Sequence, residues 1–532
     1  MSYLCYRFAS RQLFSACRAS KNPLLSYVPR RWATNGQIPP LNEALPNVPP
    51  PPSGITEQVK WTRDHHETHV TTLPNGIKVA SEESFGQFST VGVVIDGGSR
   101  YEVDHPNGVT HVIEKMAFQS TAKFPSHDDI MQELEPVGGM ADCTSFRDAI
   151  VYGTSSFTSG LPLAVEVLSE AVMRPQITSQ EVDEQKMLVQ FELENLEMRL
   201  DPEPILTDMV HAAAYRNNTL GFPKLCPPQN LPVINRETIM EFMKTYYQPD
   251  RMVIAGVNVD HEQLVELTKK HFTDKPSWHT EGASVTPPDH SIAQYTGGII
   301  TDHTAEPRVN PGPTPLPELA HVSIGLESTS YDDPDFFAFT VLNMLMGGGG
   351  SFSAGGPGKG MYSRLYLNVL NKYHWIYSAT AYNHSYSDSG MFCIHASAHP
   401  TQLRDLVQVL VKEYFSLTKG LISEVELARA KKQLQSMLMM NLESRVIVFE
   451  DIGRQVLGLG ERRSAGELYE CIENVTMDDI LRVSSRMLAS KPSVAAFGNL
   501  TFLPKYEDIS AAFINKGTLS AKSRFTLPFR TR

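Results

Sequence analysis

The order of strand-like and helix-like patterns in the first half of this chain recurs in the second half, offset by about 230 to 245 residues. Each copy contains a strand, a helix, a hairpin and a long helix, predicted at 89–96, around His111, 140–157 and 178–199 in the first copy and at 321–327, 334–346, 375–398 and from Ser423 in the second. A short motif repeats at this spacing, since Asn195-Leu196-Glu197 returns as Asn441-Leu442-Glu443. The duplication predicts an α+β fold of two similar domains, each with a mixed or antiparallel sheet and flanking helices.

Proline-rich segments separate the predicted domains. The run Pro49–Pro52 belongs to a segment that is typical of an extended arm. The segment 282–317 is also rich in proline and has little hydrophobic periodicity, which predicts a linker. The predicted organisation is a leader at 1–32, an arm at 33–64, a first domain at 65–281, a linker at 282–317, a second domain at 318–510 and a tail at 511–532.

The leader has the composition of a mitochondrial transit peptide. The first 42 residues contain no Asp or Glu, while residues 1–32 carry six arginines and lysines among serines and apolar residues. This composition is typical of a transit peptide, and a disordered basic tail is the alternative. Arg30-Arg31 followed by Trp32-Ala33 resembles a matrix cleavage site. We therefore expect cleavage near Trp32 and Ala33 and a location in the mitochondrial matrix, with association with the inner membrane left open.

The mature chain is predicted to be strongly acidic. The full sequence has a formal net charge of −12, and loss of the leader's six positive charges lowers it to −18. Such a charge argues against a nucleic-acid partner and suits basic peptides. No run approaches the roughly 18 apolar residues of a membrane span. The six cysteines are scattered without a C-x-x-C pair, which predicts reduced thiols.

The fragment His111-Val112-Ile113-Glu114-Lys115 resembles a zinc-protease motif in which one ligand is missing. In an H-x-x-E-H helix, two histidines four residues apart share a Zn²⁺, and the glutamate deprotonates the metal-bound water. Lys115 occupies the second ligand position, where a protonated ammonium has no lone pair and opposes a cation. Taken alone, such a fragment is usually an ordinary polar helix face, so the interpretation as a zinc motif depends on its surroundings.

A glycine-rich run is the other candidate site. Eight of the fourteen residues are glycine, and the spacing matches neither a P-loop nor a G-x-G-x-x-G motif. A spacer and a substrate-contacting loop therefore remain as the two interpretations. The run comprises Gly347, Gly348, Gly349, Gly350, Ser351, Phe352, Ser353, Ala354, Gly355, Gly356, Pro357, Gly358, Lys359 and Gly360.

These motifs together resemble those of the pitrilysin-type metallopeptidases, a family that includes mitochondrial processing peptidases and the core proteins of respiratory complex III. The resemblance covers roughly residues 65 to 510. It includes the residues flanking His111, and it includes Glu192, 77 positions after Lys115, where the family places its third zinc ligand. The glycine run resembles the loop of the family's alpha-type, non-catalytic subunits and is the most specific part of the match.

The resemblance implies two duplicated domains of the pitrilysin/LuxS type and a heterodimer with a beta subunit. In such a pair the beta subunit holds the zinc, and this chain binds the basic amphipathic presequences of imported precursors. His111, Glu114, Lys115 and Glu192 would then form a degenerate site with no metal, no cofactor and no catalysis of its own. A core subunit of respiratory complex III is the alternative function, although those proteins generally lack the long glycine run.

Overall fold

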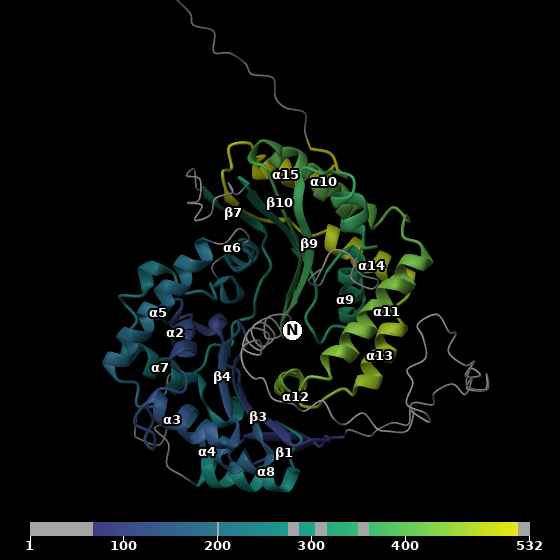
Figure 1. Ribbon diagram of the computed structural model, residues 1–532. Coiled ribbons are helices and arrows are strands. Elements are labelled where there is room, and N and C mark those ends of the chain that lie inside the picture. The colour runs from purple at the N-terminus through teal and green to yellow at the C-terminus, as the bar shows by residue number, and fades with distance from the viewer. Residues whose placement is uncertain are drawn as a thin grey trace, which may run out of the picture. The chain divides into compact units, whose positions relative to one another are not determined.

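Two β-sheets organise the structure, a computed structural model that describes residues 67–198, 202–216, 218–274, 287–303, 317–348, 361–515 and 517–519. The strand order is β1-β2-β6-β3-β5-β4 in the first sheet and β7-β11-β8-β10-β9 in the second (Figure 1). The strands of the first sheet are β1 (Thr68–Thr72), β2 (Lys78–Glu82), β3 (Phe88–Ile95), β4 (Met140–Ser145), β5 (Ile150–Phe157) and β6 (Met252–Val257). Those of the second are β7 (Gly298–His303), β8 (Ala320–Glu327), β9 (Ile376–Ser385), β10 (Gly390–Ala398) and β11 (Ser493–Gly498).

The two sheets share one topology apart from an added edge strand. β2 pairs with β6 in parallel, as β7 does with β11, and the other neighbouring strands are antiparallel. The series β2-β6-β3-β5-β4 therefore corresponds strand by strand to β7-β11-β8-β10-β9, and β1 is the addition. This correspondence confirms the predicted α+β fold with its internal duplication.

Strand β7 lies inside the segment predicted as the linker, 282–317, so that segment is not linker throughout. It is the counterpart of β2, but among the described strands it has a neighbour, β11, on one side only. Its burial therefore falls along the strand from buried Gly298 to exposed His303, whereas β2 is buried over four of its five residues. A half-exposed edge strand lacks the apolar alternation by which strands are recognised in a sequence.

Each sheet has one face covered by helices of its own half. In the first half they are α2 (Val109–Met116), α3 (His127–Leu134), α4 (Leu161–Met173), α5 (Ser179–Glu197), α7 (Arg236–Tyr246) and α8 (His261–Thr268). In the second they are α9 (Phe336–Met346), α10 (Leu403–Ser416), α11 (Glu424–Asn441), α13 (Ala465–Glu473), α14 (Met477–Leu488) and α15 (Tyr506–Ile514). Thr178 and Ser423 begin the long helices α5 and α11 with capping boxes, in which each side chain accepts a hydrogen bond from the helix backbone.

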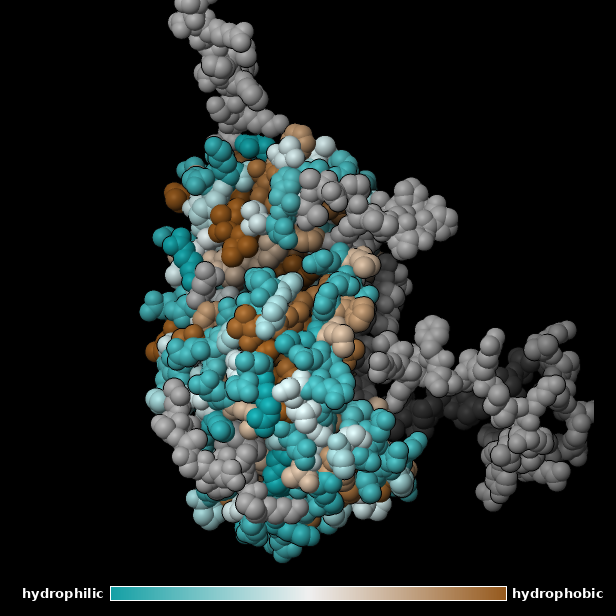
Figure 2. Space-filling model, turned by 90° about the vertical axis from the view of Figure 1, so that its left-hand side faces the viewer, coloured by the Kyte–Doolittle hydropathy of each residue, from teal (hydrophilic) through white to brown (hydrophobic). Residues whose placement is uncertain are grey.

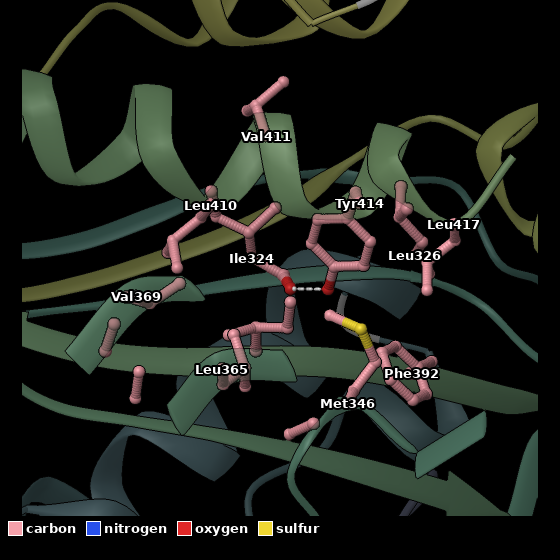
Figure 3. Close-up of a cluster of buried hydrophobic side chains, with 14 of the residues drawn as sticks. Ile324, Leu326, Met346, Leu365, Val369, Phe392, Leu410, Val411, Tyr414 and Leu417 are labelled. Atoms are coloured by element: carbon pink, nitrogen blue, oxygen red, sulfur yellow. Dashed lines mark hydrogen bonds between the residues drawn. The ribbon is translucent and has the colours of Figure 1, made fainter. Parts of the chain in front are cut away.

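The second-half core illustrates how this packing buries polar groups as well. Leu410 and Tyr414 of α10, and Leu417 directly after it, lie over Ile324 and Phe392 of the sheet (Figure 3). The buried Tyr414 hydroxyl donates a hydrogen bond to the carbonyl oxygen of Ile324 at 2.7 Å (Figure 3). The ring thus contributes apolar area while its hydroxyl is satisfied, which a buried tyrosine requires.

The opposite face of each sheet is covered by a helix from the other half. Helix α12 (Arg445–Leu459) of the second half packs Val448, Phe449 and Ile452 against the first sheet. Helix α6 (Glu203–Tyr215) of the first half packs against Met391 and Cys393 of the second sheet. Each of these helices follows the long helix of its own half, so the exchange has the same form in both halves. The two helices link the halves into one compact unit.

Two glycines allow α12 to approach the first sheet closely. A Cβ atom on Gly92 of β3 would lie 2.4 Å from the Phe449 ring, and a Cβ on Gly453 of α12 would lie 2.4 Å from the Val94 side chain. Both distances are far shorter than van der Waals contact. The missing side chain of Gly92 leaves the space that the Phe449 ring fills, and the missing side chain of Gly453 leaves space for Val94.

Candidate functional site

Helix α2 begins at a buried carboxylate that holds its first turn. Gly108, the N-cap, has a φ of 96°, and Glu102 accepts hydrogen bonds from the Gly108 and Thr110 backbone N–H groups at 2.6 and 2.8 Å. Burial raises the pKa of Glu102 to about 7, although the hydrogen bonds from Thr110 and Gly108 act in the opposite direction. Helix α5 packs beside α2. This arrangement brings His111, Glu114 and Lys115 of α2 together with Glu192 of α5.

The Lys115 ammonium is the centre of this group. Its nitrogen lies 2.7 Å from Glu192 Oε2 and 2.9 Å from Glu114 Oε1. Burial alone would lower the pKa of Lys115, but the two carboxylates outweigh it and raise this pKa above its ordinary value. Lys115 is therefore a fixed cation between two acidic side chains, one from each helix.

Glu114, the residue at the general-base position of the motif, has both carboxylate oxygens engaged. One oxygen contacts Lys115, and the other accepts hydrogen bonds from the Ser145 backbone N–H at 2.9 Å and the Ser145 hydroxyl at 2.7 Å. Burial would raise the pKa of Glu114, yet the positive charges of Lys224 and Lys115 prevail and lower it to about 2. A carboxylate held in this way is a poor proton acceptor near neutral pH.

The buried His111 ring is oriented so that the lone pair on Nδ1 is already used. Its Nδ1 accepts a hydrogen bond from the Cys226 backbone N–H at 3.1 Å, and its Nε2 lies 3.6 Å from Glu192 Oε2. A neutral imidazole carries one proton, so we infer that this proton is on Nε2 and faces the carboxylate. In that tautomer Nε2 has no lone pair with which to bind a metal.

The donor set does not fit a catalytic zinc ion, which takes three protein ligands and a water. His111 and Glu192 occupy two of the three ligand positions of the motif, and the Lys115 ammonium occupies the other. Among the residues that the structure describes, no group of three or more His, Cys, Asp or Glu side chains is arranged to hold a metal ion. The charge that a metal would supply is supplied by Lys115.

The glycine run starts at the end of α9, and only its first two residues are described. Gly347 has a φ of 129° and ends the helix, and the Gly348 N–H donates to the Asn343 carbonyl at 2.7 Å. A Cβ on Gly348 would lie 2.2 Å from the Asn343 side-chain amide, so a larger residue here would require that amide to move. Residues Gly349 to Gly360 lie outside the described residues, as do the leader with Trp32 and Ala33, the arm, most of the tail and parts of the linker.

Sequence reasoning missed the residues that fix the orientation of the site. Ser145 is 31 positions from Glu114 and Cys226 is 115 positions from His111. Their contacts depend on sheet pairing and loop placement, for which no local pattern gives a signal. Within the described parts of the chain, no helix has the length and apolar character needed to span a membrane.

Comparison with protein families gives two adjacent matches. Residues 78–228 match the family described as insulinase (peptidase family M16), and residues 234–434 match the peptidase M16 inactive domain. The chain is 51% identical over 490 residues to "Mitochondrial-processing peptidase subunit alpha" of Homo sapiens, covering 92% of each chain. The protein of that name in Caenorhabditis elegans is 43% identical, covering 84% of this chain and 87% of the relative.

A solved structure supports the fold alone. The crystal structure of a protease from Helicobacter pylori superimposes with a TM-score of 0.70 at 19% sequence identity. The match covers 81% of this chain and 99% of that one.

Proposed function

The chain belongs to peptidase family M16, in the group of the mitochondrial-processing peptidase alpha subunits, and we propose that it recognises presequences without cutting them. Its relatives are mitochondrial, so the proposed place of action is the mitochondrion, and within it the matrix. The reaction served is hydrolysis of the peptide bond that releases the targeting presequence from an imported precursor. The named relatives are processing-peptidase subunits, and this does not favour the alternative of a complex III core subunit.

The position of Lys115 is the observation on which the non-catalytic part of this proposal rests. The Lys115 ammonium fills the second ligand position and binds both Glu114 and Glu192, at 2.9 and 2.7 Å. Zinc binding would require this cation to leave and His111 to change tautomer, and Glu114 would still be bonded to Ser145. We therefore assign the zinc, its water and bond hydrolysis to a beta partner subunit in a heterodimer.

Substrate binding is supported by charge and by the glycine run. The predicted mature chain has a net charge of −18, and presequences are basic, so their fields are complementary. The run from Gly347 to Gly360 connects α9 to the residues before β9, and deletion of a connecting segment need not disturb the core on either side. We propose that this run contacts the presequence.

Deleting Gly347 to Gly360 is expected to leave association with the beta subunit intact and to weaken presequence binding by about tenfold or more. A polar, glycine-dense run offers little apolar area to a permanent interface, where buried hydrophobic surface dominates. The measurements are a pull-down with the beta subunit and a fluorescence titration with a labelled presequence. Loss of the heterodimer, or normal peptide affinity in the complex that forms, would show that the run is structural.

A further inference from the structure

Helix α5, together with the residue that caps its C-terminus, presents a stripe of large apolar side chains to solvent, defined by Met187, Leu188, Phe191 and the capping residue Met198. Their exposed fractions are 56%, 54%, 62% and 71%, respectively. At 3.6 residues per turn, Met187, Phe191 and Met198 project within a narrow sector of the helix surface, and Leu188 borders it. Figure 2 looks at the side of the molecule that carries α5 and shows hydrophobic residues at the surface among hydrophilic ones.

This stripe is on the face of α5 opposite to the core. The buried residues of the helix are Val182, Gln185, Val189 and Leu196, which repeat every three or four positions on the other side. The apolar stripe therefore adds nothing to the packing of α5 on α2. Apolar side chains grouped on one face and rimmed by polar residues mark an interaction surface.

The rim of the stripe is acidic. Helix α5 has six acidic residues and one basic residue, Lys186. Glu181 closes the capping box and Glu192 binds Lys115, while Asp183, Glu184 and Glu194 contact only exposed or half-buried neighbours on α5 itself: Lys186, Gln180 and Gln190. These three acidic residues and Glu197 are exposed on the flanks of the stripe.

We propose that this face of α5 is a docking site for the basic amphipathic helix of a presequence, which lays its apolar side on the stripe and its arginines toward the acidic rim. The inference rests on the proposed function and adds a second contact surface to it. Helix-on-helix recognition of this kind uses apolar anchors three or four residues apart, and Met187 and Phe191 are four residues apart.

The composition of the stripe favours a varied ligand over a permanent subunit interface. Presequences differ in sequence, and methionine is unbranched and flexible, so a surface with Met187 and Met198 adapts to different apolar partners. A permanent interface would be depleted of charge around its apolar core. Four exposed carboxylates beside the stripe instead complement a ligand that carries arginines.

The test uses the complete heterodimer with the beta subunit and a fluorescent peptide of residues 1–32 of this chain, which has six basic residues and no acidic ones. The double variant Met187→Ser, Phe191→Ser removes two apolar anchors and is expected to raise the Kd by about tenfold or more. Glu184→Gln with Glu194→Gln keeps the stripe and is expected to weaken binding less and to reduce its dependence on salt. The matched control is Met440→Ser. Met440 is 59% exposed on α11, the long helix of the second half, and its replacement should leave the Kd unchanged.

Each outcome decides a different point. If the wild-type heterodimer binds the peptide and the double variant binds it equally well, the α5 docking site is wrong and the proposed function stands. If the wild-type heterodimer does not bind the peptide, the proposed function itself fails. If the double variant keeps its circular dichroism spectrum but no longer pulls down the beta subunit, the α5 face is a subunit interface and the docking proposal is overturned.

Discussion

Replacing Phe449 with alanine is expected to lower the free energy of unfolding by about 3–5 kcal/mol, the usual loss when a buried phenylalanine leaves a cavity. Phe449 is 2% exposed and belongs to the second half of the chain, yet its ring packs on the first sheet beside Gly92. The two halves should still unfold in one transition, because each sheet depends on a helix from the other. Denaturant unfolding followed by circular dichroism measures both quantities.

The control for this change is Phe502→Ala. Phe502 is 50% exposed, so its removal should change the free energy of unfolding by no more than about 0.5 kcal/mol. A loss at Phe449 as small as that at Phe502, or two separate transitions in the wild-type chain, would contradict the helix exchange as the tie between the halves.

Replacing Lys115 with methionine is the second change with a large expected effect. Methionine keeps much of the side-chain stem but removes the ammonium, so Glu114 and Glu192 remain as neighbouring anions with no cation between them. Removing one partner of a buried ion pair costs about 3–5 kcal/mol, and we expect the lower end because the Glu192 side chain is 28% exposed. Lys123→Met is the control, since its pair with Glu166 is at the surface and should contribute no more than about 1 kcal/mol.

The pH dependence of stability distinguishes an electrostatic role of Lys115 from a role in packing alone. The pKa of Glu114 is lowered from its ordinary value of 4.5 to about 2 in the folded chain. A lowered carboxyl pKa stabilises the fold above pH 4.5, and the stabilisation is lost as the pH falls toward 2. The difference in stability between wild type and Lys115→Met should therefore be largest near neutral pH and narrow on acidification. A difference that does not vary with pH would mean that Lys115 acts through packing alone.

Much of the architecture follows from sequence patterns that are local. The capping residues Thr178 and Ser423 predict where the long helices begin, and hydrophobic alternation predicts the two hairpins that become β4–β5 and β9–β10. Periodicity shows that a helix has an apolar face, but it does not show which sheet that face covers. The exchange of α6 and α12 between the halves therefore could not be predicted from the sequence.

At the candidate site, too, the sequence predicts what depends on local spacing but not what depends on tertiary contacts. Four-residue spacing places His111 and Lys115 on one side of α2, and the family resemblance supplies Glu192. The sequence indicated that Lys115 opposes a metal ion, but not that it binds both neighbouring carboxylates. The roles of Ser145 and Cys226 depend on tertiary placement, so they emerge only from the structure.

The most direct measurement is the zinc content and presequence cleavage of the purified mature chain, taken alone and after assembly with the beta subunit. We expect the chain alone to hold no stoichiometric zinc after dialysis and to leave a presequence peptide intact. The heterodimer should hold about one zinc ion and cut the peptide, because a catalytic zinc needs the three protein ligands that this chain lacks. About one zinc ion per isolated chain, lost in a His111→Ala variant and accompanied by cleavage, would contradict a non-catalytic subunit.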